Sequence, residues 1–213
     1  MQRTYTITRI SDLEPITPQL WSSIPPLGID HYIWEDNGYQ PEVQVRLCYT
    51  SLKLHLNFVT YEINPLIRYY HMNEPVYTDS CVEFFVQPSP YIDTRYLNFE
   101  INAAGTLLLG LGESRDRVRL SDVDPKTFSI QPQVNCINPA DQRTYWEIQY
   151  SVPFGFIQSH FSDFQPESGT KLKGNFYKCG NDTAEPHYGC WNLIEEAHPN
   201  YHLSSYFGEL ILE

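Results

Sequence analysis

Two segments in the middle of the chain, Tyr77–Pro88 and Tyr96–Thr106, alternate apolar and polar side chains at every second position. Successive side chains of a strand point to opposite faces, so each segment predicts a strand with one buried face and one polar face. If the two strands are neighbours, their polar side chains form one surface rich in carboxylates and amides. We expect the functional site on that surface, which would carry Glu83, Asn98, Glu100 and Asn102.

The rest of the chain extends this pattern into an all-β fold. Aromatic residues make up 15% of the sequence and prolines outnumber glycines by 16 to 11, a composition typical of strands and turns. Strand follows strand with one short helix expected near Phe154–Phe161, which predicts an antiparallel β-sandwich of the immunoglobulin or jelly-roll kind. The further strands expected are Val43–Thr50, Leu52–Tyr61, Thr106–Gly112, Phe128–Val134, Thr144–Val152, Lys171–Lys178, Tyr188–Leu193 and Tyr206–Leu212.

The sequence predicts a single domain that covers residues 1–213, because no repeat or linker divides it. Its first 42 residues contain Pro15, Pro18, Pro25, Pro26 and Pro41. Proline cannot donate a hydrogen bond to a sheet, so we expect this segment to wrap around the domain rather than to enter the sheet interior.

Charge and hydropathy narrow the range of partners. The chain has 14 basic and 26 acidic residues, a formal charge of −12 that repels nucleic acids and anionic membranes. The N-terminus has no apolar signal-peptide core, and no window approaches the roughly 18 apolar residues of a membrane span. The sequence as it stands therefore predicts a cytoplasmic protein without nucleic-acid or membrane partners, an expectation that fails if a signal peptide has been removed. The oligomeric state stays open.

The five cysteines are Cys48, Cys81, Cys136, Cys179 and Cys190, an odd number without a metal-binding spacing. We expect them to be free and buried. A bridge between Cys179 and Cys190, which flank one loop, is the alternative.

A family resemblance rests on five motifs in order: Asp79-Ser-Cys-Val-Glu-Phe-Phe-Val, Asn98-Phe-Glu-Ile-Asn-Ala-Ala-Gly-Thr, Trp146-Glu-Ile followed by Val152-Pro, Asn175-Phe-Tyr-Lys, and His187-Tyr-Gly-Cys-Trp. Together with a terminal Phe207-Gly, they resemble the family 9 carbohydrate-binding modules, within the dopamine-monooxygenase N-terminal-like group of β-sandwiches. The resemblance extends from about Trp21 to the C-terminus. It implies non-catalytic binding of a sugar, in which aromatic rings contact the sugar faces while carboxylates and amides contact the hydroxyls.

The resemblance implies a role for Glu83 as a sugar-binding carboxylate, for Asn102 as an amide ligand and for Trp191 as a stacking ring. The sequence departs from the family pattern twice, because Val76 stands where the family has a second tryptophan and Glu100 stands where it has an arginine. We expect these departures to change or abolish the family's ligand preference. A missing ring would be replaced by Tyr69, Tyr70, Tyr77 or Trp34.

Further residues join the candidate carbohydrate-binding set. Asn175 and Tyr177 share one face of an expected strand and are predicted to line the same groove, so the full set is Glu83, Glu100, Asn102, Asn175, Tyr177 and Trp191. Trp146 alternates with Ile148 and is expected in the core.

Three other functions stay open at this stage. Glu83 and Glu100 would suit a glycoside hydrolase if their carboxyl groups lie roughly 5–9 Å apart. Some members of the wider sandwich group bind haem through Met with His or Lys. In this chain, Met72 with His71 or His187 would supply such ligands. A tyrosine-rich face would equally suit a protein partner. No cofactor is certain, and structural calcium, common in the family, would use Asp79, Asp93, Asp122 or Asp124.

Overall fold

The computed structural model describes residues 2–35 and 37–213, and most of its regular structure is strand. The N-terminal part contains β1 (Thr4–Arg9), α1 (Pro18–Ser23), β2 (Leu27–Ile29), β3 (His31–Tyr32), β4 (Val43–Tyr49) and β5 (Lys53–Thr60). The middle contains η1 (Val76–Thr78), β6 (Cys81–Gln87), β7 (Tyr96–Asn102), β8 (Leu107–Gly112), β9 (Val118–Arg119), η2 (Pro125–Phe128) and β10 (Gln131–Ile137). The C-terminal part contains β11 (Thr144–Pro153), α2 (Phe154–His160), β12 (Lys171–Cys179), β13 (Tyr188–Cys190), η3 (Ser204–Tyr206) and β14 (Gly208–Leu212).

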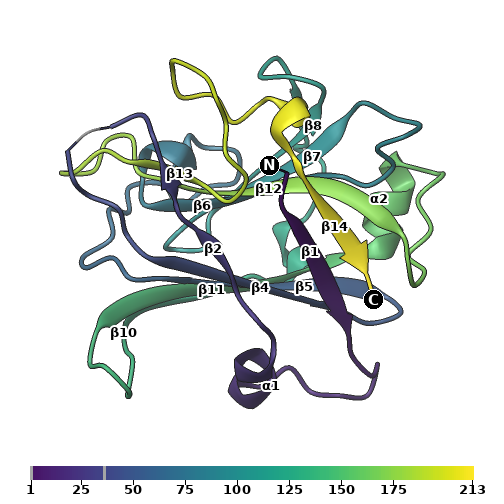
Figure 1. Ribbon diagram of the computed structural model, residues 1–213, viewed down its shortest axis with the longest axis horizontal. Coiled ribbons are helices and arrows are strands. Elements are labelled where there is room, and N and C mark those ends of the chain that lie inside the picture. The colour runs from purple at the N-terminus through teal and green to yellow at the C-terminus, as the bar shows by residue number, and fades with distance from the viewer. Residues whose placement is uncertain (1, 36) are drawn as a thin grey trace.

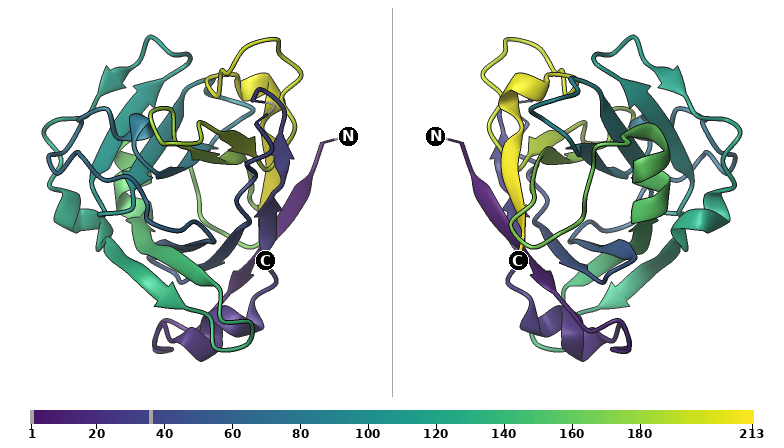
Figure 2. Two further views of the ribbon diagram at one scale, coloured as in Figure 1. Left: turned by 90° about the vertical axis from the view of Figure 1, so that its left-hand side faces the viewer. Right: turned by 90° about the vertical axis from the view of Figure 1, so that its right-hand side faces the viewer.

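The strands form one curled sheet whose two halves face each other (Figures 1 and 2). One half has the order β10-β11-β5-β4, with β2 also paired to β4. The other half has the order β14-β12-β6-β7-β8-β9, and β13 and β3 extend it from β12. Strand β1 joins the halves because it pairs with β14 through its first residues and with β4 through its last.

The predicted all-β class is confirmed, and the sheet is mixed rather than antiparallel throughout. Strand β1 runs parallel to both neighbours, with Thr4–Ile7 beside Glu209–Leu212 and Thr8–Arg9 beside Cys48–Tyr49. The expectation that the whole N-terminal segment only wraps around the sheet is wrong for the same strand. The prolines begin at Pro15, so residues 4–9 keep all their backbone donors and can occupy an interior position.

The main hydrophobic core fills the space between the two halves. Its centre is aromatic: Phe84 and Phe176, on adjacent strands β6 and β12, stack with ring centroids 4.8 Å apart, and Phe58 from the opposite half lies 6.1 Å from Phe176. Trp146 is fully buried here, as predicted from its alternation with Ile148. No helix among the described residues is long and apolar enough to cross a membrane.

The outward face of β6 and β7 is largely covered as well, so every residue of both strands is buried. A second apolar cluster covers this face and includes Phe85, Tyr96 and Tyr177, with Tyr201 and Phe207 contributed by the segment that leads to β14. This covering is incomplete, and the part of the face that carries Glu83 and Glu100 opens into a cavity.

Candidate functional site

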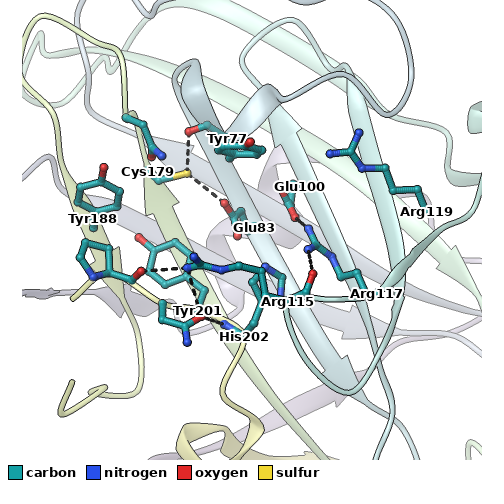
Figure 3. Close-up of a pocket in the computed structure, with 13 residues that line it drawn as sticks. Tyr77, Glu83, Glu100, Arg115, Arg117, Arg119, Cys179, Tyr188, Tyr201 and His202 are labelled. Carbon is teal, nitrogen blue, oxygen red and sulfur yellow. Dashed lines mark hydrogen bonds and ion pairs between the residues drawn. The ribbon is translucent and has the colours of Figure 1, made fainter. Parts of the chain in front are cut away.

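A cavity of about 440 Å³ lies on the outward face of β12, β6 and β7 (Figure 3). Strands β12, β6 and β7 supply its floor. Its walls come from η1, residues 115–119 up to the end of β9, the segment from Asn181 to the first residue of β13, and residues 199–202. We refer to this cavity as the pocket. Its lining consists of Tyr77, Glu83, Glu100, Arg115, Arg117, Arg119, Cys179, Asn181, Tyr188, Pro199, Asn200, Tyr201 and His202.

The floor is built as the sequence predicted. Strands β6 and β7 are antiparallel neighbours, and Glu83 stands directly opposite Glu100. Directly opposed side chains on neighbouring strands have Cβ atoms roughly 4.5–5.5 Å apart, so the two carboxyl groups are close. On the other side of Glu83, the register of β12 places Tyr177 opposite it.

Glu83 is a buried carboxyl group in an environment that favours its neutral form. Burial raises the pKa of Glu83 well above its ordinary value, and the nearby Cys179 and Glu100 raise it further. The Cys179 thiol donates a hydrogen bond to Glu83 Oε1 over 3.0 Å. The hydrogen bonds of the Glu83 carboxyl to other described residues involve only Oε1, which leaves Oε2 and its proton available to a ligand.

Glu100 has a cationic partner that the sequence did not reveal. Arg117 Nη2 lies 2.5 Å from Glu100 Oε1, and Arg117 Nε donates to Asn98 Oδ1 over 2.7 Å. Burial raises the pKa of Glu100 above its ordinary value, and the charge of Arg117 lowers it only in part. The guanidinium therefore stabilises the ionised carboxylate on the pocket floor.

A glycine makes room for this arginine. A Cβ atom on Gly110 would lie 2.3 Å from Asn98 Oδ1 and 2.8 Å from Arg117 Nε, both far below van der Waals contact. Gly110 lies directly opposite Asn98 in the β7–β8 pairing. The absence of a side chain at this position allows the guanidinium of Arg117 to lie against the sheet and reach Glu100.

The walls of the pocket are aromatic. Tyr77, Tyr188 and Tyr201 surround Glu83 (Figure 3). Tyr201 is held by a parallel stack on Tyr177, with centroids 4.0 Å apart and planes 8° apart. Trp34 supports two of these rings from behind, 6.4 Å from Tyr188 and 5.8 Å from Tyr201. Tyr77 and Tyr188 remain partly exposed and offer ring surface to a ligand.

Two exposed arginines stand at the rim. Arg115 Nη2 donates to the Pro199 carbonyl over 3.1 Å, so its side chain reaches from the β8–β9 segment to the wall on the other side (Figure 3). Arg119 Nη1 donates to the Asn73 carbonyl over 2.8 Å. Within the described part of the chain, neither guanidinium forms an ion pair with a carboxylate.

Trp191, the predicted stacking ring, does not line the pocket. It is 3% exposed and belongs to the main core, where its ring lies 5.6 Å from Phe176 at 73°. Gly208 is so close that a Cβ atom there would lie 2.4 Å from the indole. The preceding Cys190 lies in the second apolar cluster, so strand alternation directs the Trp191 side chain inward, and its position does not support the predicted contact with sugar.

The other predicted residues lie on the expected face of the sheet, but other parts of the chain cover them. Asn102 donates to Asp79 Oδ2 over 3.0 Å and to the Tyr69 carbonyl over 2.9 Å. Asn175 donates to the Asn192 carbonyl over 2.9 Å. Tyr177 is buried beneath Tyr201. All three are fully buried and do not line the pocket, so of the six predicted residues the structure brings only Glu83 and Glu100 together there.

Sequence reasoning missed most residues of the pocket walls, among them Tyr188, Tyr201 and three arginines. The arginines alternate with other residues in Arg115-Asp-Arg-Val-Arg119, a period-two pattern that would have placed them on one face of an extended segment. Tyr201 has no comparable signal, because the segment that carries it is irregular, whereas Tyr188 begins the expected strand Tyr188–Leu193.

All five cysteines are free, so the alternative of a Cys179–Cys190 bridge is wrong. The β12–β13 register pairs Cys179 with Tyr188 and Cys190 with Tyr177. Cys81 instead lies directly opposite Cys179. The potential ligand atoms of Cys81, Glu83 and Cys179 lie within 4.8 Å of one another and could hold a metal ion.

Two of the side chains considered for calcium and haem, Asp79 and His187, have other partners. Asp79 is buried and forms an ion pair with Arg68 at 2.9 Å. His187 is buried and lies 2.6 Å from the Lys178 Nζ atom, which also contacts Glu62 at 3.2 Å. Calcium binding stays a prediction.

Comparison with known proteins decides the family. A model of carbohydrate-binding family 9 matches residues 21–212. The chain belongs to this family. The predicted family resemblance is thus confirmed, and with it the prediction of carbohydrate binding.

Solved structures of family 9 modules and a related protein share the fold. A putative carbohydrate-binding protein from Bacteroides uniformis is 28% identical, with a TM-score of 0.83 and full coverage of both chains. A family 9 module from Caldicellulosiruptor kristjanssonii in complex with glucose is 14% identical, with a TM-score of 0.66, and covers 99% of this chain and 96% of its own. The same kind of module from that organism with cellotriose has 14% identity, a TM-score of 0.64 and coverages of 98% and 94%. The search of curated proteins gave no significant match.

The structure also gives a physical reading of the two departures from the family pattern. Val76 is buried in the second apolar cluster, whereas the next residue, Tyr77, lines the pocket. Glu100 brings a negative charge where the family has a positive one, but Arg117 lies against it. The pocket therefore has an aromatic ring and a guanidinium, but Tyr77 and Arg117 contribute them instead of the two positions of the family pattern.

Proposed function

We propose that this family 9 module binds a sugar in the pocket, with Tyr77 and Tyr188 against the apolar ring faces and the floor carboxyls against hydroxyl groups. One observation carries the proposal: two partly exposed tyrosines and two carboxyl groups line a single open cavity of about 440 Å³. Small-molecule pockets are typically about 300–1,000 Å³, so the cavity has the size for one or two sugar units.

The polar groups match the chemistry of a sugar. Hydroxyl groups donate and accept hydrogen bonds, so they need both kinds of partner. The neutral form of Glu83 offers a donor and an acceptor, Glu100 beside Arg117 offers acceptor oxygens, and Asn181 offers an amide. We propose that the cavity, closed at one end by the sheet, takes a terminal sugar unit rather than the interior of a chain.

The test is a glycan screen by calorimetry or NMR titration, followed by the variants Tyr188→Ala and Tyr77→Ala. Loss of one stacking ring removes about 1 kcal/mol of binding free energy, so we expect the affinity for the best sugar to fall roughly fivefold to tenfold. Tyr91→Ala is the matched control, because Tyr91 is 74% exposed and does not line the pocket.

Two outcomes would count against this function. A protein that ignores every glycan in the screen would point to a protein-binding module. Release of reducing sugar that stops in Glu83→Gln would show hydrolysis instead of binding alone, because the close pair of carboxyl groups would then act on the substrate.

A further inference from the structure

The pocket has the opposite charge from the rest of the molecule. The chain carries a formal charge of −12, yet three of its 14 basic residues line this one cavity: Arg115, Arg117 and Arg119. Positive charges gathered on an acidic protein concentrate anions at that place and repel them elsewhere. A pocket built only for neutral hydroxyl groups has no need of this arrangement.

The acidic residues of the pocket do not cancel this charge. Glu83 is neutral, because burial raises its pKa. Within the described residues, Glu100 forms its ion pair with Arg117. Burial also lowers the pKa of His202 to about 3, so this ring adds no charge at neutral pH. The positive charges of Arg115 and Arg119 are therefore uncompensated within the described lining of the pocket.

The two rim arginines are also free to bind. Both side chains are exposed, and each uses one terminal nitrogen on neutral oxygens of the protein, Arg115 Nη2 on Pro199 and Asn200 and Arg119 Nη1 on Asn73. A guanidinium has five donors, so several N–H groups of each remain for a ligand. Arg117, by contrast, donates from all three nitrogens to Asn98, Glu100 and the Arg115 carbonyl.

We propose that the pocket selects an acidic sugar whose carboxylate binds at Arg115 and Arg119, a uronic acid rather than a neutral hexose. The inference rests on the proposed function, since the tyrosines and Glu83 would hold the ring while the rim arginines hold the anionic group. A planar carboxylate matches the fork of a guanidinium in two parallel hydrogen bonds. The carboxylate of a hexuronic acid projects from the ring edge, so it can reach the rim while the ring faces the tyrosines.

The experiment compares pairs of sugars that differ only in the presence of the carboxylate. Glucose is titrated beside glucuronic acid, galactose beside galacturonic acid, and mannose beside mannuronic acid, with acetate as an anion that has no ring. We expect one uronic acid to bind at least about tenfold more tightly than its neutral partner, the size of one charge-assisted hydrogen bond. Raising the salt from 50 to 500 mM should narrow this ratio, because the rim is exposed to solvent.

The variants Arg115→Gln and Arg119→Gln test whether the positive charge of each arginine is responsible for the preference for uronic acids. Each should bring the uronic acid close to the affinity of the neutral sugar and leave the neutral sugar unchanged. Arg119→Lys should restore part of the difference, since it keeps the charge without the fork. Lys126→Gln is the control for net charge, because Lys126 is exposed and does not line the pocket.

The outcomes distinguish the two proposals. Equal binding of neutral and acidic sugars, unaffected by either arginine variant, would overturn the acidic-sugar inference and leave sugar binding intact. Binding of acetate as tightly as the uronic acids would show an anion site without a sugar site and overturn both. Tighter binding of a sulfated hexose than of any uronic acid would overturn the carboxylate assignment in favour of a sulfate ester.

Discussion

At the scale of single residues, Glu83 makes the stability of the protein depend on pH. Its carboxyl group is protonated in the fold because burial raises its pKa, whereas in the unfolded chain it ionises near its ordinary value of 4.5. As pH rises above that ordinary value, the unfolded state loses the proton and the folded state keeps it, so this group lowers the free energy of unfolding. The stabilising contribution of the Glu83 carboxyl is fully present below its ordinary pKa. It is lost progressively as the pH rises toward the raised pKa of the folded protein.

Glu83→Gln removes this dependence, since an amide does not titrate. We expect the free energy of unfolding of the variant, relative to wild type, to increase steadily from pH 4 to pH 8 in urea titrations. Glu195→Gln, which changes an exposed glutamate outside the pocket, should show no such trend. A constant difference between Glu83→Gln and wild type at all pH values would contradict a protonated Glu83. The groups that face this carboxyl are Cys179, Glu100, Cys81 and Arg117.

The ion pair between Arg117 and Glu100 gives a second prediction at this scale. Arg117→Met leaves Glu100 buried without its cation, and breaking one side of a buried pair costs about 3–5 kcal/mol of unfolding free energy. The double variant Glu100→Gln with Arg117→Met should recover a large part of the loss, because no unpaired charge remains. Urea unfolding of the two single variants and the double variant measures the coupling directly, and additive effects would contradict it.

At the scale of elements, strand β8 determines whether Arg117 can reach the sheet. We expect Gly110→Ala to destabilise the fold by about 1–3 kcal/mol, because the added methyl group overlaps Asn98 and Arg117. The loss should be smaller when Arg117→Met is already present, since one of the two overlapping groups is then gone. Gly155→Ala is the control: Gly155 is exposed and a Cβ atom there would meet nothing within 4 Å. If Gly110→Ala lowers the free energy of unfolding equally with and without Arg117→Met, then Gly110 does not act by making room for Arg117.

Strands β6 and β7 show which part of the site could be predicted from the sequence and which part could not. Alternation in β6 and β7 predicts which side chains share a face, and Glu83 and Glu100 are opposed as expected. Alternation does not say what covers that face. Asn102 and Tyr177 are on it too, but Tyr69 and Tyr201, far away in sequence, lie over them. Long-range contacts from irregular segments thus decide which polar residues a ligand can reach, and these contacts have no local sequence period.

At the scale of the whole molecule, β1 connects the two halves of the curled sheet. Ile7 is fully buried in the main core, its strand pairs with β14 up to this residue, and the pairing with β4 begins at Thr8. The sequence could not predict this position, because a six-residue strand with alternating side chains fits an edge as well as an interior. Its parallel pairing on both sides depends on where β4 and β14 lie in the fold.

A proline at this junction should therefore affect both halves. Ile7→Pro removes a backbone donor from the interior of the sheet together with a core side chain, and we expect it to cost more than about 3 kcal/mol. Ile7→Val, which keeps the donor and most of the packing, should cost about 1 kcal/mol. Hydrogen exchange gives the specific readout: in Ile7→Pro, the amide of Tyr49 in β4 and the amide of Glu213 directly after β14, which donates to the Ile7 carbonyl over 3.0 Å, should lose protection together. Loss of protection in β14 alone would mean that the half containing β4 is stable without β1, and that the strand is an edge of one layer rather than the connection between two.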